Sequence, residues 1–167
     1  RPLVMDFPKD KKVLDMDTEY MFGRSFLVRP VTDSLYTWQD KKQNGYQKNM
    51  RKIEKTDVYL PEGSNWFDFW TGAKLAGGQT IQREVPIDIM PVYIRAGSII
   101  PWGPAVQYAT EKSWDDLEIR VYPGANATFI LSAISVLFSV LKNSNSFSIL
   151  SYPSCVNNTS FSSIWHF

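Results

Sequence analysis

Residues 57–72 read DVYLPEGSNWFDFWTG and contain two short apolar runs on either side of a turn. In the first run Val58 and Leu60 alternate with other residues, and the second run, residues 66–70, is mostly aromatic. Alternating or aromatic runs of about four to eight residues favour β-strands, and the sequence Pro-Glu-Gly-Ser between them is typical of a turn. The stretch therefore predicts two consecutive short strands.

The same pattern recurs along the chain as far as residue 129. Further strands are expected at residues 21–31, 34–38, 79–85, 91–100 and 117–122. A tight turn at residues 32–33 joins the first two of these, and Asn44-Gly45 is the expected turn of a hairpin within residues 39–49. Only residues 10–20 have weak helical character. Short strands separated by turn residues predict a mainly β protein, an antiparallel sandwich or barrel.

Composition excludes several classes of protein. The chain has 167 residues, of which 44% are hydrophobic and 21% charged, with a net charge of +1. A nucleic-acid-binding or membrane-surface protein usually carries a basic excess, so neither partner is expected. The single cysteine and the single histidine exclude a disulfide framework, a thiolate zinc cluster and a histidine metal site within the chain. Phosphate-binding and dinucleotide-binding glycine motifs are absent, so we expect no metal and no cofactor.

Charge is distributed unevenly between two regions. All 17 acidic residues and 17 of the 18 basic residues lie in residues 1–129, whereas residues 130–167 contain Lys142 alone and 11 serines. The apolar run at residues 130–141 is shorter than the roughly 20 residues that a membrane-spanning helix needs. Residues 130–167 are therefore expected to form a separate tail with a different origin from the rest.

The aromatic run offers a candidate carbohydrate-binding surface, because aromatic rings stack on the apolar faces of sugars. In a strand, Trp66 and Trp70 would share one face with Asp68, and Phe67 and Phe69 would take the other face. Packing in the core is the favoured interpretation of these rings, with sugar contact and contact with another domain as the alternatives. Trp102 is a further candidate sugar-stacking residue.

Other residues of suitable type lack a supporting pattern. Asp15, Asp17 and Glu19 begin like a calcium loop, but the glycine and glutamate that such a loop needs are absent. A triad built on His166 is not supported. A basic cluster is interpreted as an exposed hairpin, and four aspartates are candidates for a catalytic pair by residue type only. The basic residues are Lys41, Lys42, Lys48, Arg51, Lys52 and Lys55, and the aspartates are Asp68, Asp88, Asp115 and Asp116.

Several segments of this chain resemble motifs of glycoside hydrolase family 31 and follow one another in the same order as in that family, which includes α-xylosidases and α-glucosidases. RPLVMDFP at residues 1–8 is followed by YMFG at 20–23 and FLVRPV at 26–31. VYLP at 58–61, WFDFWTG at 66–72 and MPVYIRAGSIIP at 90–101 complete the match. The resemblance covers residues 1 to about 129, and the sequence around residues 32–38 and 102–104 is most similar to that of bacterial α-xylosidases.

The resemblance implies an arrangement of domains and a role. Residues 1–19 would be the end of a catalytic (β/α)8 barrel, and residues 20–129 a C-terminal β-sandwich. The family's nucleophile and acid/base aspartates belong to the barrel upstream of Arg1, so no catalytic residue is assigned in this chain. The implied partner is that barrel, through which a carbohydrate substrate would be bound. Localisation stays unknown, although such enzymes are often secreted or periplasmic.

The tail departs from the family pattern after residue 129, where an acidic turn is expected. A frameshift, a read-through intron or a gene-model error accounts for residues 130–167, with a lineage-specific extension as the alternative. For the whole chain, the resemblance implies a non-catalytic part of an α-xylosidase-like or α-glucosidase-like hydrolase, inactive alone. A stand-alone carbohydrate-binding sandwich using Trp66, Trp70 or Trp102 and a non-functional gene fragment are the alternatives.

Overall fold

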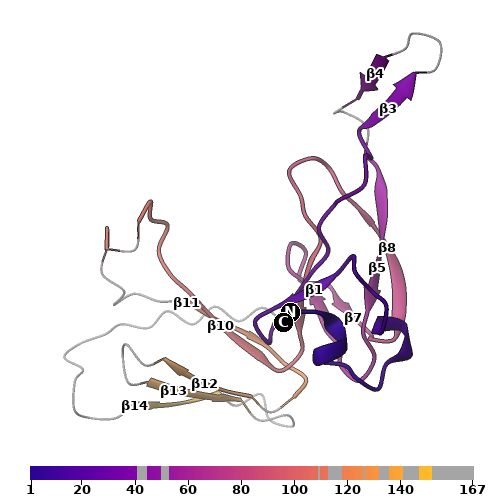
Figure 1. Ribbon diagram of the computed structural model, residues 1–167. Coiled ribbons are helices and arrows are strands. Elements are labelled where there is room, and N and C mark those ends of the chain that lie inside the picture. Colours follow the sequence, from indigo (N-terminus) through magenta and orange to yellow (C-terminus); the bar gives the residue numbers. More distant parts are fainter. Residues whose placement is uncertain are drawn as a thin grey trace. The chain divides into compact units, whose positions relative to one another are not determined.

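The chain folds almost entirely as short antiparallel strands (Figure 1). The computed structural model describes residues 1–40, 45–49, 53–108, 110–112, 118–125, 127–131, 136–140 and 147–151. Within these ranges the only helical segments are two 3-10 turns, η1 (Leu3–Met5) and η2 (Lys11–Val13). Tertiary contacts divide the chain into two compact units, Arg1–Arg95 and Ala96–Phe167, and each is described by itself.

The first unit is built on a five-stranded antiparallel sheet in the order β1-β2-β9-β6-β7. Its strands are β1 (Tyr20–Phe22), β2 (Phe26–Val28), β9 (Val92–Arg95), β6 (Trp66–Asp68) and β7 (Lys74–Leu75). Two further antiparallel pairs belong to this unit. They are formed by β5 (Lys55–Leu60) with β8 (Gln79–Glu84), and by β3 (Thr37–Asp40) with β4 (Gly45–Lys48).

One face of the five-stranded sheet forms the core of this unit. Met21 pairs with Leu27 and Leu27 with Tyr93, so their side chains share a face, and all three are buried. The N-terminal turns contribute Leu3, Phe7 and Val13 to the same cluster, and β5 contributes residues 58–60. Burying such side chains stabilises a fold by roughly 1.5–3 kcal/mol each. The layered arrangement of antiparallel strands is consistent with the expected β-sandwich.

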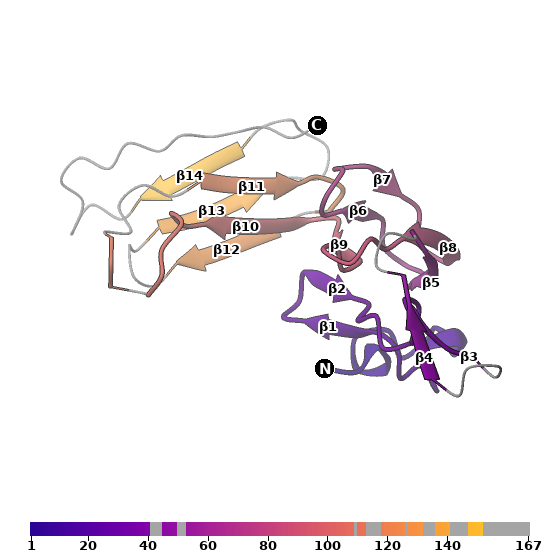
Figure 2. The same ribbon diagram turned by 90° about the horizontal axis from the view of Figure 1, so that it is seen from above.

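The second unit contains two antiparallel sheets. β10 (Ser98–Trp102) pairs with β11 (Glu118–Tyr122) over their full lengths. β12 (Ala127–Leu131), β13 (Val136–Val140) and β14 (Phe147–Ser151) lie side by side in the other sheet, as Figure 2 shows. The backbone of two segments within residues 130–167 is therefore paired as strands.

Several expected strands are confirmed, and two are not continuous. β5, β6, β8 and β11 fall within the segments predicted at residues 57–60, 66–70, 79–85 and 117–122, or extend them by two residues. Residues 21–31 instead form a hairpin of β1 and β2, because Gly23 turns the chain with a φ of 65°. Residues 91–100 are split between β9 and β10, which belong to different sheets, and Gly97 at φ 81° lies between them.

The segment around residues 32–40 also differs from expectation. β3 begins only at Thr37 and pairs with β4, whereas β2 pairs with β1 and β9, so residues 21–31 and 34–38 do not form a hairpin. The hairpin expected within residues 39–49 is confirmed by the pairing of β3 with β4. Its turn residue Asn44 lies outside the described residues. Of the weakly helical region at residues 10–20, only η2 is helical.

Candidate functional site

Trp66 packs as a core residue. Its side chain is fully buried, its ring centroid lies 5.9 Å from that of Phe7, and its indole N–H donates to the Pro61 carbonyl at 3.0 Å. Because no ring face meets solvent, the core-packing alternative describes this tryptophan in the structure.

Trp70 lies beyond the end of β6 and is 48% exposed. The strand ends at Asp68 because one oxygen of the Asp68 carboxylate accepts the backbone N–H groups of Trp70 and Thr71, both at 2.9 Å, and turns the chain. The Trp70 indole N–H donates to the Met90 carbonyl at 2.8 Å. The expectation that Trp66 and Trp70 share one strand face is therefore wrong.

Trp102 ends β10 in the second unit and is 39% exposed. The Arg120 guanidinium lies 4.2 Å from the centroid of the indole ring, a cation–π contact, and is itself paired with Glu118. Trp102 and Glu118 are direct partners across the two strands. The three residues form a partly exposed aromatic and charged surface on this sheet, in which Glu118 and Arg120 are half-buried.

The candidate carboxylates have structural surroundings where the structure describes them. Asp68 is buried and forms an ion pair with Arg83 at 3.3 Å in addition to its turn hydrogen bonds. Asp88 is exposed, and Asp115 and Asp116 lie outside the described residues. Among the residues that are described, no group of three or more histidine, cysteine, aspartate or glutamate side chains could hold a metal ion. Of the basic cluster, Lys48 and Lys55 are exposed, and Lys41, Lys42, Arg51 and Lys52 lie outside the described ranges.

Glu19 has a different surrounding from the other two acids of the supposed calcium loop. Asp15 and Asp17 are exposed, but Glu19 is buried, and its Oε1 accepts the backbone N–H of Tyr59 at 2.8 Å. Its Oε2 is buried without a hydrogen-bond partner among the described residues. Burial raises the pKa of Glu19 to about 7, against the smaller opposing effects of the Tyr59 N–H and the Arg29 charge.

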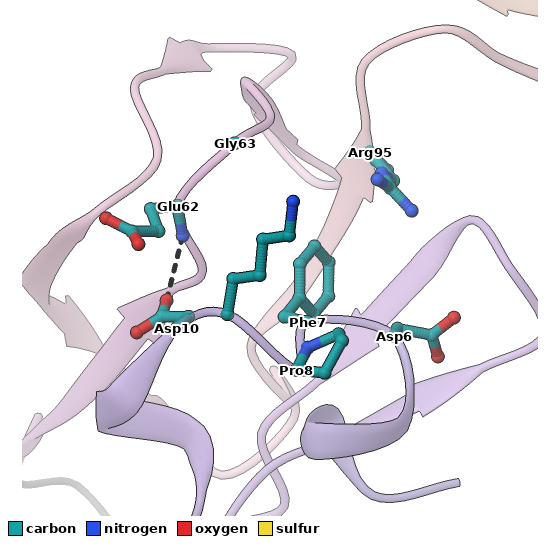
Figure 3. Close-up of a pocket in the computed structure, with 8 residues that line it drawn as sticks. Asp6, Phe7, Pro8, Asp10, Glu62, Gly63 and Arg95 are labelled. Atoms are coloured by element: carbon teal, nitrogen blue, oxygen red, sulfur yellow. Dashed lines mark hydrogen bonds between the residues drawn. The ribbon is translucent and has the colours of Figure 1, made fainter.

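A cleft of about 430 Å³, which the sequence did not reveal, opens in the first unit. Figure 3 shows its lining, which comes from residues 6–10, from Glu62 and Gly63 in the turn after β5, and from Arg95 at the end of β9. We call it the Lys9 cleft. Its residues come from three segments separated by more than 30 positions each, so sequence spacing could not bring them together. In the sequence most of these residues belong to separate motifs: RPLVMDFP at residues 1–8, the Pro-Glu-Gly-Ser turn, and MPVYIRAGSIIP at residues 90–101.

Asp10 is the most heavily bonded side chain of the Lys9 cleft. Its carboxylate accepts the Lys12 N–H at 3.0 Å, the Tyr59 hydroxyl at 2.7 Å and the Glu62 N–H at 3.0 Å. Burial alone would raise the pKa of Asp10, but these three hydrogen bonds outweigh it and leave the pKa below its usual value. Asp10 therefore stays ionised and ties the N-terminal segment to the turn after β5.

The other walls of the Lys9 cleft are also held by the protein. Asp6 accepts two hydrogen bonds from the Arg1 guanidinium, both at 2.6 Å. The Arg95 Nε donates to the Ser64 hydroxyl at 2.9 Å, and its guanidinium lies 5.0 Å from the centroid of the Phe7 ring. A cleft with charged and apolar walls fixed in advance is suited to binding a polar molecule, and its lining contains no serine, cysteine or histidine nucleophile.

No helix in the described part of the chain is long and apolar enough to cross a membrane.

Comparisons with known proteins relate the chain to glycoside hydrolases. The family model described as the glycosyl hydrolase family 31 C-terminal domain matches residues 1–100. An α-xylosidase of Saccharolobus solfataricus is 41% identical over 132 residues, which are 78% of this chain and 16% of that protein. Human neutral α-glucosidase C is 38% identical over 120 residues, which are 68% of this chain and 11% of that protein.

Solved structures give a similar result. The GH31 α-xylosidase of Xanthomonas citri superposes with a TM-score of 0.76 and 30% identity, covering 99% of this chain and 18% of that one. The cycloalternan-forming enzyme of Listeria monocytogenes superposes with a TM-score of 0.68 and 30% identity, covering 86% of this chain and 13% of that one. The chain thus spans less than a fifth of the length of each of these relatives.

Proposed function

The chain belongs to glycosyl hydrolase family 31, and from this premise we propose that it is the non-catalytic C-terminal part of a longer enzyme. That enzyme would hydrolyse terminal α-xylosidic or α-glucosidic bonds in carbohydrate metabolism. The observation that carries the proposal is the match of residues 1–100 to the family's C-terminal domain, in a chain that spans 16% of the similar α-xylosidase.

The surroundings of the carboxylates support a structural role. Retaining glycoside hydrolysis needs a pair of carboxyl groups about 5–5.5 Å apart, one as nucleophile and one as acid/base. Here the buried acids are engaged elsewhere: Asp10 holds a turn, Asp68 pairs with Arg83, and Glu19 accepts a strand N–H. The catalytic pair would lie in a barrel encoded upstream of Arg1, and the sugar substrate would be bound there.

Within this proposal, residues 1–19 are the last segment of the barrel region and residues 20–129 the C-terminal sandwich. Their role is to cover the barrel and help to hold it. Residues 130–167 would be a tail whose sequence arose by a frameshift, a read-through intron or a gene-model error, even though residues 136–140 and 147–151 pair as strands. The nucleotide sequence tests the frameshift: another reading frame that encodes an acidic turn after Phe129 supports it, and the absence of such a turn from all other frames counts against it.

The proposal predicts that the purified 167-residue chain has no glycosidase activity. Its hydrolysis of aryl α-xylosides and aryl α-glucosides should equal the rate without enzyme, while an intact family 31 α-xylosidase under the same conditions turns them over. Detectable turnover by the chain alone would contradict the proposal.

A second candidate function is a stand-alone carbohydrate-binding module. The exposure of Trp70 and Trp102, 48% and 39%, favours it, because each presents part of an indole ring to solvent. Sugar contact is proposed for these two residues and no longer for the fully buried Trp66. Titration of tryptophan fluorescence with xylose, glucose and xyloglucan fragments tests it. A saturable change that Trp70→Phe or Trp102→Phe abolishes would support it, and no saturable change would contradict it.

A further inference from the structure

Both faces of the five-stranded sheet are apolar, although only one of them faces the N-terminal turns and β5. An antiparallel sheet with one face in water usually carries polar side chains on that face. The β5–β8 pair follows this rule, as at Lys55 and Glu84, which are opposite each other and exposed. The second face of the five-stranded sheet does not. Strand alternation, with Met21 and Tyr93 on the core side, assigns to it Tyr20, Phe22, Phe26, Val28, Val92, Ile94, Phe67 and Phe69.

Four aromatic side chains form a continuous strip along this second face, and we call them the Phe22 strip. The ring centroids of Phe22 and Phe26 lie 6.4 Å apart, those of Phe26 and Phe69 6.4 Å, and those of Phe69 and Trp70 5.1 Å. The two ends are open to solvent, since Phe22 is 67% and Trp70 48% exposed, whereas Phe26 and Phe69 are half-buried. Contiguous exposed apolar surface of this kind marks a site of contact with another protein surface.

Arg1 lies beside the Phe22 end of the strip. Its amino group donates to the Met21 carbonyl at 2.7 Å, the Met21 N–H donates to the Arg1 carbonyl at 2.9 Å, and Pro2 forms an antiparallel bridge with Tyr20. A residue joined to Arg1 would therefore lie opposite Phe22, and residues opposite each other in an antiparallel pair share a face. A domain that precedes Arg1 would thus be attached directly beside the Phe22 strip.

We propose that the Phe22 strip is the surface through which this chain packs against the catalytic barrel of the longer enzyme. The inference rests on the proposed function, which supplies the barrel and its attachment before Arg1. The strip carries no charge, so it fits an apolar patch of the barrel, whereas a charged partner group would lose its water without gaining an ion pair. Sugar contact by Trp70, part of the second candidate function, needs this end of the strip to stay open, so the two proposals exclude each other at Trp70.

Hydroxyl-radical footprinting read by mass spectrometry tests the contact without any substitution. It compares the 167-residue chain, at concentrations at which sedimentation shows a monomer, with the longer enzyme expressed from the transcript that contains the Arg1 codon. Oxidation of Phe22 and Trp70 should be severalfold slower in the longer enzyme. Tyr46 is the control, because it is 81% exposed on β4 and away from the strip, and its oxidation should be equal in both proteins. Equal oxidation of Phe22 in the two proteins would overturn the proposal.

A substitution measured in both proteins gives a second, independent readout. Phe22→Thr keeps a residue that favours strands but removes the ring. It should leave the unfolding temperature of the 167-residue chain nearly unchanged, because the ring is mostly in solvent, and lower that of the longer enzyme. Tyr46→Thr, the matched control, should lower neither. An equal shift for Phe22→Thr in the two proteins would count against a barrel contact.

The remaining outcomes separate this proposal from other occupants and from the proposed function. Protection of Phe22 that disappears when the longer enzyme is diluted to monomers would assign the strip to a second copy and overturn the proposal. A longer enzyme that hydrolyses aryl α-xylosides but leaves Phe22 as reactive as in the 167-residue chain would overturn it while the proposed function stands. A transcript that encodes no barrel would contradict the proposed function itself, and this inference with it.

Discussion

The buried carboxyl of Glu19 makes the stability of the fold dependent on pH in a predictable direction. Its Oε1 bonds the edge of β5 through the Tyr59 N–H, and its Oε2 is buried without a partner among the described residues. Burial raises the pKa from the usual 4.5 to about 7. At about 1.36 kcal/mol per pKa unit, this shift corresponds to roughly 3 kcal/mol.

The sign of the effect follows from proton binding. Between about pH 4.5 and pH 7 the folded chain keeps a proton on Glu19 that the unfolded chain has lost. The Glu19 contribution to the free energy of unfolding therefore falls by about 3 kcal/mol as the pH rises through this window, and changes no further above it. Glu19→Gln retains an oxygen for the Tyr59 N–H but does not titrate. We expect the variant to match the original chain near pH 4 and to be more stable by up to about 3 kcal/mol near pH 8.

Urea unfolding followed by tryptophan fluorescence, at several pH values between about 4 and 8, measures this difference. Glu84→Gln is the control, because Glu84 is 60% exposed in its pair with Lys55 and should show no comparable pH-dependent gain. A difference in unfolding free energy between Glu19→Gln and the original chain that stays constant across the pH range would contradict a raised pKa of Glu19. So would a loss of stability in the variant at every pH.

Five further substitutions, grouped into three tests, probe the packing and the turns. Trp66→Ala should lower the free energy of unfolding by about 3–5 kcal/mol and Trp70→Ala by much less, because only Trp66 is fully buried. Equal losses of the two variants in urea unfolding would contradict this difference in burial. Asp10→Asn should lower the free energy of unfolding by about 2–3 kcal/mol near neutral pH, since it places an amide N–H₂ group beside groups that donate to the carboxylate, such as the Tyr59 hydroxyl. That cost should shrink in acid as the pH falls through the lowered pKa of Asp10, and a pH-independent cost would count against it. Gly97→Ala should lower the thermal unfolding temperature more than Gly23→Ala does. Both glycines have a positive φ, but only at Gly97 would the new Cβ lie 2.5 Å from the Ala125 Cβ. The reverse order of the two unfolding temperatures would be inconsistent with the structure.

The sequence predicted the class of fold because short apolar runs and turn residues are local signals. β5 and β6 appear where residues 57–72 placed them, and the Pro-Glu-Gly-Ser turn lies between them. The errors occurred where one glycine turns an otherwise continuous apolar run. Gly23 and Gly97 both have positive φ, and nothing in the composition of the runs at residues 21–31 and 91–100 distinguishes them from long strands.

Side-chain alternation was a weaker guide than strand position. Val58 and Leu60 alternate in the sequence and are both buried, but Tyr59 between them is also buried, because its hydroxyl bonds Asp10 from the N-terminal segment. It put Trp66 and Trp70 together, whereas the Asp68 carboxylate ends the strand between them. Both outcomes depend on hydrogen bonds that a two-residue period does not contain.

The Lys9 cleft could not be predicted because it depends on tertiary contacts. Asp10, Glu62 and Arg95 meet only when the N-terminal segment is tied to the turn after β5 and β9 enters the sheet beside β6. The family resemblance was recognisable from the sequence because it rests on several motifs in a fixed order between residues 1 and 101, and the match of residues 1–100 to the family's C-terminal domain confirms it.

The central claim is that this chain is one part of a longer family 31 hydrolase whose catalytic residues are encoded elsewhere. Sequencing the transcript that contains the Arg1 codon tests it most directly. We expect an in-frame upstream segment encoding a (β/α)8 barrel with a pair of catalytic aspartates. A transcript whose upstream sequence encodes no such barrel would contradict it.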